Sequence, residues 1–153
     1  MTGHVARAEV TVAATPAQVW RVLTAPGARP ELMLGAETVT DWQVGSPIVW
    51  RGEWHGTPFE DKGEVLEVVP GRRLAVTHYS PLGGQPDEPA SYHRVIWTLE
   101  EASAPGAADG EPTTVVRLEQ DNNATPEAAA QSSEHWATML EGLRTVTERE
   151  RSS

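Results

Sequence analysis

The stretch that decides the fold lies near the C-terminus, where residues 125–149 read TPEAAAQSSEHWATMLEGLRTVTER. Thr125, Pro126 and Glu127 form a typical helix start, so the pattern predicts one long helix from there to about Arg149. The second half of this helix carries a single apolar stripe, made of Trp136, Met139, Leu140, Leu143 and Val146. The first half carries small residues instead, namely Ala128, Ala129, Ala130, Ser132 and Ser133. We expect one end to fill a core and the other to leave room beside whatever it covers.

Upstream of this helix, the chain alternates between strand-like segments and turns. A capping box over residues 15–18, with Pro16 at the first helical position, predicts a short helix that ends before the Pro-Gly pair at 26–27, and one more helical turn is predicted at 31–34. Strands are predicted at residues 5–12, 37–41, 48–54, 59–69, 72–79, 92–101 and 113–120. Successive hairpins imply an antiparallel sheet, and the long helix is the apolar partner that can bury one face of it. The predicted fold is therefore α+β, a curved antiparallel sheet of about six to seven strands wrapped on the long C-terminal helix, with one or two short helices after the first strand.

Composition limits both the class of protein and its partners. A chain of 153 residues without Cys suits a single domain over residues 1–153. The net charge is −10, so nucleic acid, which needs a basic surface, is not an expected partner. No apolar run is long enough to predict membrane insertion, and the first residues lack a secretory leader, so we expect a cytoplasmic protein.

Alternation in the strand 48–54 gives the first candidate ligand-binding residues. One face carries Ile48, Trp50, Gly52 and Trp54, and it belongs inside because it is the apolar face. Trp50 and Trp54 would form an aromatic wall for a ligand, with a gap at Gly52 between the two rings. The alternative is that both rings fill the core, as large aromatic side chains commonly do.

Three further strands place polar side chains in line with apolar ones. The inward faces are predicted to carry His78, His93, Trp97, Gln120 and Asn122. Polar groups that converge in an apolar chamber commonly orient a ligand, and an imidazole can also move a proton. The alternative is that each His bonds a backbone carbonyl or lies at the strand mouth near water, and that residues 121–123 form only a turn into the helix.

These patterns give one set of candidate ligand-binding residues and no catalytic set. The candidates are Trp50, Trp54, His78, His93, Trp97, Gln120, Ser132, Trp136 and Met139. The five His are not spaced for a compact metal site, and the sequence has no phosphate-binding Gly loop and no nucleophile elbow. We therefore predict no metal and no cofactor.

Two polar regions complete the predictions. The pairs Glu60–Asp61 and Glu100–Glu101 are predicted to be exposed charges at strand ends. The loop 80–90 is rich in Pro and Gly, and loops of that length commonly serve as lids or partner surfaces, although a surface excursion without a role is the alternative.

Five sequence pieces, in this order and spacing, carry a resemblance to a known family. They are VAATPAQVW at 12–20, WQVGSP at 42–47, GEVLEVVPGRRL at 63–74, WTLE at 97–100 and WATMLEGL at 136–143. With them the chain resembles the START-like (SRPBCC) superfamily and, within it, the branch of activators of heat-shock ATPases (AHSA). The resemblance implies a helix-grip fold with an internal cavity between the sheet and the long helix. It also implies that relatives bind hydrophobic small molecules there, and that a few catalyse cyclisation or dehydration.

Three functional hypotheses follow, in descending rank. The first is binding of a hydrophobic small molecule in the cavity, without catalysis. The second is a cyclase or dehydratase in which His78 or His93 acts as general base and Tyr92 or Gln120 polarises a carbonyl, which requires a buried acid–base pair within hydrogen-bond reach.

The third hypothesis is a chaperone-interacting module related to the heat-shock-ATPase activators, docking through the acidic surface or the loop 80–90. The resemblance weakens this hypothesis, because the eukaryotic co-chaperone of the branch has a further amino-terminal domain for which this chain has no room. It also implies pairing as a homodimer.

Overall fold

The computed structural model describes residues 2–25, 27–28, 36–54, 56–81, 84–102 and 112–151, without the side chains of residues 27, 28, 54 and 151. The strands are β1 (His4–Val12), β2 (Gly27–Ala28), β3 (Glu37–Val39), β4 (Pro47–Trp54), β5 (Thr57–Val69), β6 (Arg73–His78), β7 (His93–Ala102) and β8 (Thr113–Asn123). The helices are α1 (Pro16–Leu23), a 3-10 turn at Pro89–Ser91, and α2 (Pro126–Arg151). The helical turn predicted at 31–34 lies outside the described residues.

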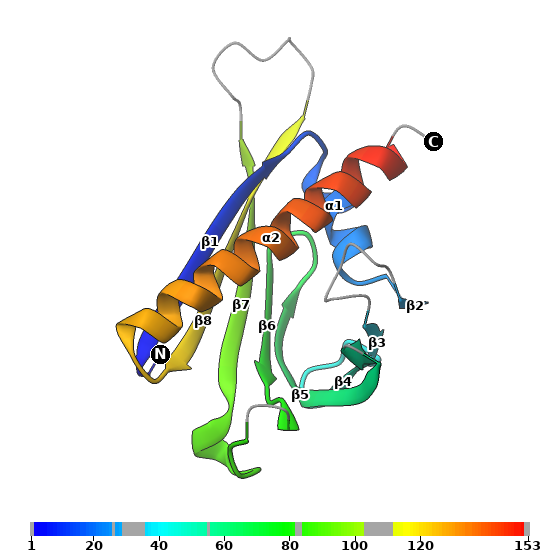
Figure 1. Ribbon diagram of the computed structural model, residues 1–153. Helices are drawn as coiled ribbons and strands as arrows, with labels where there is room; N and C mark the ends of the chain where they lie inside the picture. The colour runs from blue at the N-terminus through cyan, green and yellow to red at the C-terminus, as the bar shows by residue number, and fades with distance from the viewer. Residues whose placement is uncertain are drawn as a thin grey trace.

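The strands form one antiparallel sheet in the order β1-β8-β7-β6-β5-β4-β3-β2, and α2 runs diagonally across one face of it (Figure 1). The helix packs mainly on β1 and on α1. This arrangement confirms the predicted α+β helix-grip fold. The two-residue strand β2 was not predicted, because the Pro and Gly around it read only as a helix break.

Local chemistry sets the two helix starts. Gln18 N donates to Thr15 Oγ1 over 3.1 Å and Thr15 N donates to Gln18 Oε1 over 2.9 Å, so the predicted capping box is confirmed. At the start of α2, Ala128 N donates to Thr125 Oγ1 over 3.0 Å.

No helix in the described part of the chain is long and apolar enough to cross a membrane.

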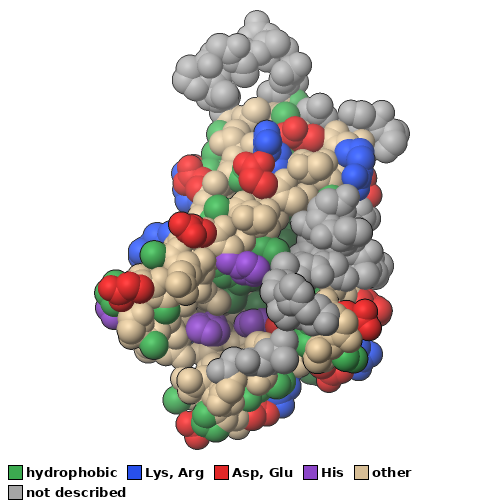
Figure 2. Space-filling view, viewed as in Figure 1, with side chains coloured by type: hydrophobic (Ala, Val, Ile, Leu, Met, Phe, Trp, Pro, Cys, Tyr) green, Lys and Arg blue, Asp and Glu red, His purple; other side chains and the backbone are tan. Residues whose placement is uncertain are grey.

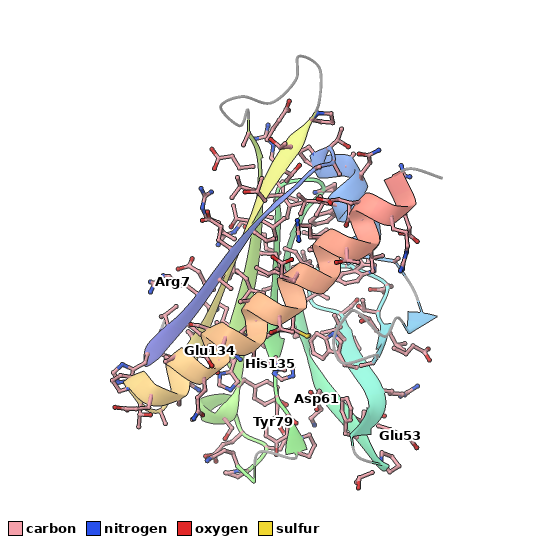
Figure 3. The ribbon with its side chains drawn as sticks, turned by 45° about the horizontal axis from the view of Figure 1, so that its top comes forward. Arg7, Glu53, Asp61, Tyr79, Glu134 and His135 are labelled. Atoms are coloured by element: carbon pink, nitrogen blue, oxygen red, sulfur yellow. The ribbon has the colours of Figure 1, made fainter. Side chains whose placement is uncertain are left out.

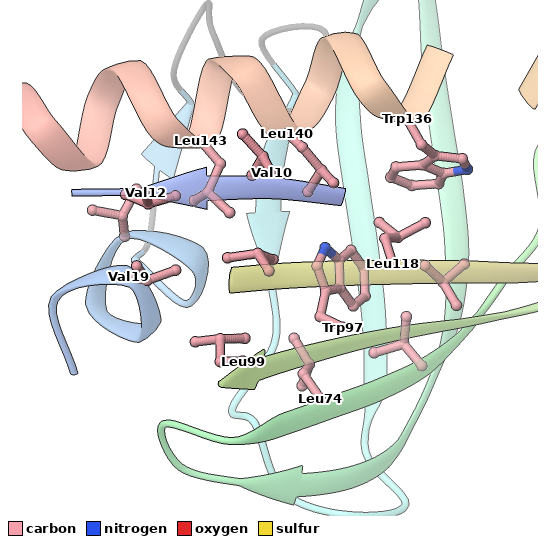
Figure 4. Close-up of a cluster of buried hydrophobic side chains, with 14 of the residues drawn as sticks. Val10, Val12, Val19, Leu74, Trp97, Leu99, Leu118, Trp136, Leu140 and Leu143 are labelled. Carbon is pink, nitrogen blue, oxygen red and sulfur yellow. The ribbon is translucent and has the colours of Figure 1, made fainter. Parts of the chain in front are cut away.

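The core lies between α2, α1 and the sheet (Figure 4). Four residues of the predicted α2 stripe are buried, with exposed fractions of 5% for Trp136, 2% for Leu140, 3% for Leu143 and 0% for Val146. They pack against buried residues of the sheet, among them Leu74, Trp97 and Leu118. The C-terminal half of α2 therefore fills the core, as its spacing predicted.

A bend in β5 divides the sheet into two parts. Its first half pairs with β4, with Trp50 opposite Asp61 and Pro47 opposite Glu64. Its second half pairs with β6 from Val65 onward, across a register shift. A Cβ at Gly63 would lie 1.8 Å from the Thr77 carbonyl oxygen, so only Gly allows β6 to approach β5 this closely. β4 pairs with the first half of β5, and its Trp50 belongs to the same buried cluster as Trp136 and Leu140 of α2.

Candidate ligand-binding site

A hollow of about 360 Å³ lies beneath the first half of α2, on the sheet face that the helix covers. This volume falls in the range of roughly 300–1,000 Å³ typical of small-molecule sites. Its lining residues come from β4, β5, β6, β8, α2 and the segment before β3, and they are Ala36, Trp50, Phe59, Asp61, His78, Gln120, Ala128, Gln131, Ser132, His135, Trp136 and Met139. In the space-filling view, histidine side chains gather around a hollowed face below this helix (Figure 2).

One wall of the hollow is apolar and largely aromatic. Trp50 on β4 and Trp136 on α2 are both buried, with exposed fractions of 4% and 5%. Phe59 and Met139 complete this wall and are partly buried. The gap predicted at Gly52 is filled, because a Cβ there would already lie 3.0 Å from the Phe59 ring and 3.3 Å from Ala36. The other predicted flank of that gap, the Trp54 side chain, lies outside the described residues.

Beside this aromatic wall, a polar wall holds a hydrogen-bonded pair of ionisable groups. His78 Nε2 donates to Asp61 Oδ2 over 2.9 Å, and the two side chains are only 16% and 15% exposed. The Trp50 ring meets the His78 ring edge to face, with centroids 5.1 Å apart. The prediction that Asp61 is an exposed strand-end charge was therefore wrong, whereas its neighbour Glu60 is exposed and pairs with Arg51 over 2.9 Å.

The sheet geometry explains why Asp61 points inward. Along β5 the residues Phe59, Asp61, Gly63 and Val65 alternate with exposed ones and share the inner face. Lys62 bridges Tyr79, so Gly63 lies opposite His78 and Asp61 lies diagonally across from it. Because Gly63 has no side chain, the Asp61 carboxylate can reach the His78 ring. Sequence alternation alone could have found this inward carboxylate.

Three buried polar atoms on this wall have no hydrogen-bond partner among the described residues. They are Asp61 Oδ1, His78 Nδ1 and Gln120 Oε1. Leaving a buried polar group unpaired costs about 1–3 kcal/mol, so each such group in a native structure requires an explanation. All three belong to residues that line the same hollow.

His93 and Asn122 lie differently from the prediction. His93 Nδ1 donates to the Asp121 carbonyl oxygen over 2.7 Å, its ring lies 6.4 Å from that of His78, and it does not line the hollow. The alternative reading of a backbone-bonded His therefore describes His93. Asn122 adopts φ 61°, which breaks the strand alternation, and its Nδ2 donates to the Ala90 and Tyr92 carbonyls at 2.8 and 3.1 Å.

The first half of α2 covers the hollow and lines it with small and polar residues. Ser132 Oγ donates to Asn123 Oδ1 over 3.0 Å, so this predicted site residue also ties the helix to the end of β8. Figure 3 shows His135 on α2 and Asp61 on β5, which both line the hollow. His135, Gln131 and Phe59 were not predicted. The placement of Gln131 and His135 at the hollow depends on how α2 lies across the sheet, and no local pattern encodes that. Phe59 lies on β5, where strand alternation could have found it.

A smaller inner chamber of about 60 Å³ continues from the hollow toward the core. Ala36, Trp50, Trp136 and Met139 line both spaces. The predicted Trp97 lines only the inner chamber, where its ring lies 6.1 Å from and perpendicular to that of Trp136. The structure thus brings together Trp50, His78, Gln120, Ser132, Trp136 and Met139 around the hollow, and places Trp97 behind them.

The described part of the loop 80–90 is tied to the sheet beside this site. Tyr79 Oη donates to the Gln85 carbonyl over 2.6 Å, and the Tyr79 and Tyr92 rings stack with centroids 5.2 Å apart. Tyr92 Oη donates to Asp87 Oδ1 over 2.7 Å, and Lys62 pairs with the same carboxylate. No described residue of this loop lines the hollow, and the described residues contain no cluster of side chains arranged to hold a metal ion.

Comparison with known proteins places the chain in a family. The family described as "Activator of Hsp90 ATPase homolog 1-like protein" matches residues 13–148. This match spans most of the chain, so the protein belongs to the Activator of Hsp90 ATPase homolog 1-like family, and the resemblance seen in the sequence is confirmed. Curated proteins give no match.

Solved structures show the same fold. A protein from Cytophaga hutchinsonii is 38% identical with a TM-score of 0.77, over 100% of this chain and 99% of that one. A protein from Mesorhizobium loti is 22% identical with a TM-score of 0.66, over 95% and 98%. Norcoclaurine synthase from Thalictrum flavum is 18% identical with a TM-score of 0.59, over 98% and 96%, and shares the fold alone.

Proposed function

We propose that the protein binds a small organic molecule with an apolar body in the hollow between the sheet and the first half of α2. The observation that carries this proposal is the combination, in one hollow of about 360 Å³, of a buried aromatic wall with three unpartnered buried polar atoms. An apolar hollow with a few convergent polar groups is the usual form of a ligand site. The fold family, whose members commonly bind hydrophobic ligands, supports the same reading.

The apolar body of the ligand would lie between Trp50 and Trp136 and extend toward the inner chamber past Met139. Burying about 200 Å² of apolar ligand surface contributes about 5 kcal/mol, from which the cost of ordering the ligand is subtracted. The polar wall then fixes the orientation, because a ligand that leaves Asp61, His78 and Gln120 unpaired forfeits their hydrogen bonds.

The test is a ligand screen that follows Trp fluorescence and melting temperature, with two matched variants. Ala128→Trp fills the hollow from α2, where Ala128 is half-buried and lines it. Ala130→Trp adds the same ring on the exposed side of the same helix. We expect binding to be lost in Ala128→Trp and kept in Ala130→Trp. Equal binding by both variants would refute the proposal.

The second candidate function is acid–base catalysis of the cyclase or dehydratase kind. The specific observation in its favour is the Asp61–His78 pair, a largely buried acid and base within hydrogen-bond distance. With Nε2–H donated to Asp61, the neutral ring keeps a free lone pair on Nδ1 that could take a proton from a bound molecule. This base would be His78, since His93 Nδ1 is held by a backbone carbonyl.

The two candidates are separated by comparing binding with turnover. If the pair is catalytic, His78→Gln removes turnover of a bound β-hydroxy carbonyl compound while its binding is kept. If the site only binds, the wild-type protein leaves such a compound unchanged over hours.

Chaperone contact and homodimer formation remain predictions that the family name and the resemblance support. A pull-down with Hsp90, comparing the wild type with a variant lacking residues 84–90, checks the first. Sedimentation of the purified protein checks the second.

A further inference from the structure

The lining of the hollow also restricts the ligand's chemistry. We propose that the buried end of the ligand carries hydrogen-bond donors, most directly a protonated amine, and that carboxylate ligands are rejected; this proposal rests on the proposed function.

The polar wall of the hollow presents hydrogen-bond acceptors that have no partner among the described residues. An ionised carboxylate can only accept hydrogen bonds, and Asp61 spends one oxygen on His78 and leaves the buried Oδ1 without a partner. In the neutral His78 ring, Nε2 carries the donated proton, so the unpartnered Nδ1 is an acceptor. Gln120 Oε1 is a third unpartnered acceptor. All three unpartnered buried atoms are therefore acceptors, and a ligand that pairs with them has to bring the donors.

The described lining of the hollow also carries a negative charge. Asp61 is the one carboxylate among the described residues that line the hollow, and neither Lys nor Arg is among them. The whole chain carries a net charge of −10. A carboxylate ligand would meet Asp61 without a permanent cation to offset the repulsion, whereas an ammonium group would pair with Asp61 Oδ1.

Aromatic side chains lie beside the Asp61 carboxylate. Trp50 lies opposite Asp61 in the β4–β5 ladder and packs on His78, and Phe59 lines the same hollow. A cation close to aromatic faces gains a further attraction that a neutral head group lacks. The hollow can thus bind both ends of such a ligand at once, with its apolar body between the indole rings and its cationic head group at the polar wall.

The experiment compares four probes that share one phenylbutyl body: butylbenzene, phenylbutanol, phenylbutylamine and phenylbutanoate. Calorimetric titrations are run at about pH 8, where a free imidazole is neutral and an alkylamine is protonated. Salt of about 0.15 M limits attraction to the acidic surface. We expect the amine to bind at least about tenfold more tightly than butylbenzene, the alcohol to lie between them, and the carboxylate to bind more weakly than butylbenzene.

Variants assign the preference to one carboxylate. Asp61→Asn should remove the roughly tenfold advantage of the amine over butylbenzene. Glu60→Gln makes the same charge change on the exposed face of the same strand, where Glu60 is 57% exposed, and should bind like the wild type. Ala128→Trp should abolish binding of all the probes, which places them in the hollow.

The outcomes separate this inference from the proposed function. If butylbenzene binds in the hollow but the amine binds no more tightly than the carboxylate, the donor-bearing ligand is refuted and the binding function stands. If no probe binds, both fail. Because the wild-type comparison of amine and carboxylate needs no variant, the inference stays testable even if Asp61→Asn does not fold. Amine binding that survives Ala128→Trp would also overturn it.

Discussion

The two halves of α2 face the same side of the sheet, but the C-terminal half fills the core and the N-terminal half covers a hollow. In the C-terminal half, Leu140, Leu143 and Val146 are at most 3% exposed and fill the space above the sheet. In the N-terminal half, Ala128 and Ser132 leave a hollow of about 360 Å³. Protein interiors are closely packed. Because the large side chains of the C-terminal half set the distance between α2 and the sheet, the small residues of the N-terminal half leave space beneath the helix. Side-chain size along α2 decides where the core ends and the hollow begins.

The greatest loss of stability is expected from a truncated side chain in the packed C-terminal half of α2. Leu140→Ala should lower the free energy of unfolding by about 2–5 kcal/mol, since it leaves a cavity in a closely packed core. Ala128→Trp enlarges a residue in the hollow half and should change the free energy of unfolding by less than about 1 kcal/mol, because its ring enters existing space. Urea denaturation measures both, and similar losses in the two variants would contradict the contrast.

The next effect concerns the bend that supports the polar wall. Gly63→Ala should cost about 1–3 kcal/mol, because the new methyl group would meet the Thr77 carbonyl oxygen at 1.8 Å and force β5 and β6 apart. Gly52→Ala is the matched control in the neighbouring strand, where the nearest atoms belong to the Phe59 ring, a side chain that can shift. Equal thermal stability of the two variants would argue against Gly63 as the reason for the bend.

A smaller effect, of opposite sign, tests what the polar wall is for. Replacing both Asp61 and His78 by Leu should leave the melting temperature unchanged or raise it, because burying the Asp61 carboxylate carries a desolvation cost that apolar side chains do not have. The same double variant should lose the preference for the amine probe over butylbenzene. A double variant that unfolds easily would instead make the pair a structural element.

The smallest effect lies in the loop 84–90. Hydrogen bonds from Lys62 and, to a smaller extent, from the Tyr92 hydroxyl lower the pKa of Asp87 below its ordinary value of 3.8. A carboxylate with a depressed folded pKa stabilises the folded state above its unfolded pKa, and this contribution is lost as pH falls through the folded pKa. We expect the titration midpoint of Asp87, measured by NMR, to lie below 3.8 and to mark the loss of amide protection in the loop. A midpoint at or above 3.8 would refute this anchoring.

Much of the fold could be predicted because its signals are periodic. The spacing of Trp136, Leu140 and Leu143 identified the α2 stripe, and strand alternation identified Trp50 and Trp97 as inward residues, both of which are buried. The capping box at Thr15 fixed the start of α1. Each of these signals is local, so it survives without knowledge of the tertiary structure.

The site was predicted less completely, because its chemistry depends on pairing between strands. Asp61 was misjudged since its charge outweighed its alternation with Phe59 and Val65. Its partner His78 lies on another strand, and their contact depends on the β5 bend at Gly63. Asn122 left its predicted face because a positive φ interrupts the alternation of β8. Register and bends of this kind are tertiary properties, which the sequence pattern does not show.

A crystal structure of the protein with phenylbutylamine would show whether the hollow beneath α2 binds an apolar amine. We expect the phenyl ring to lie between Trp50 and Trp136 and the nitrogen to lie within hydrogen-bond distance of Asp61 Oδ1. An empty hollow with the amine bound elsewhere on the acidic surface, at concentrations where calorimetry detects binding, would contradict it.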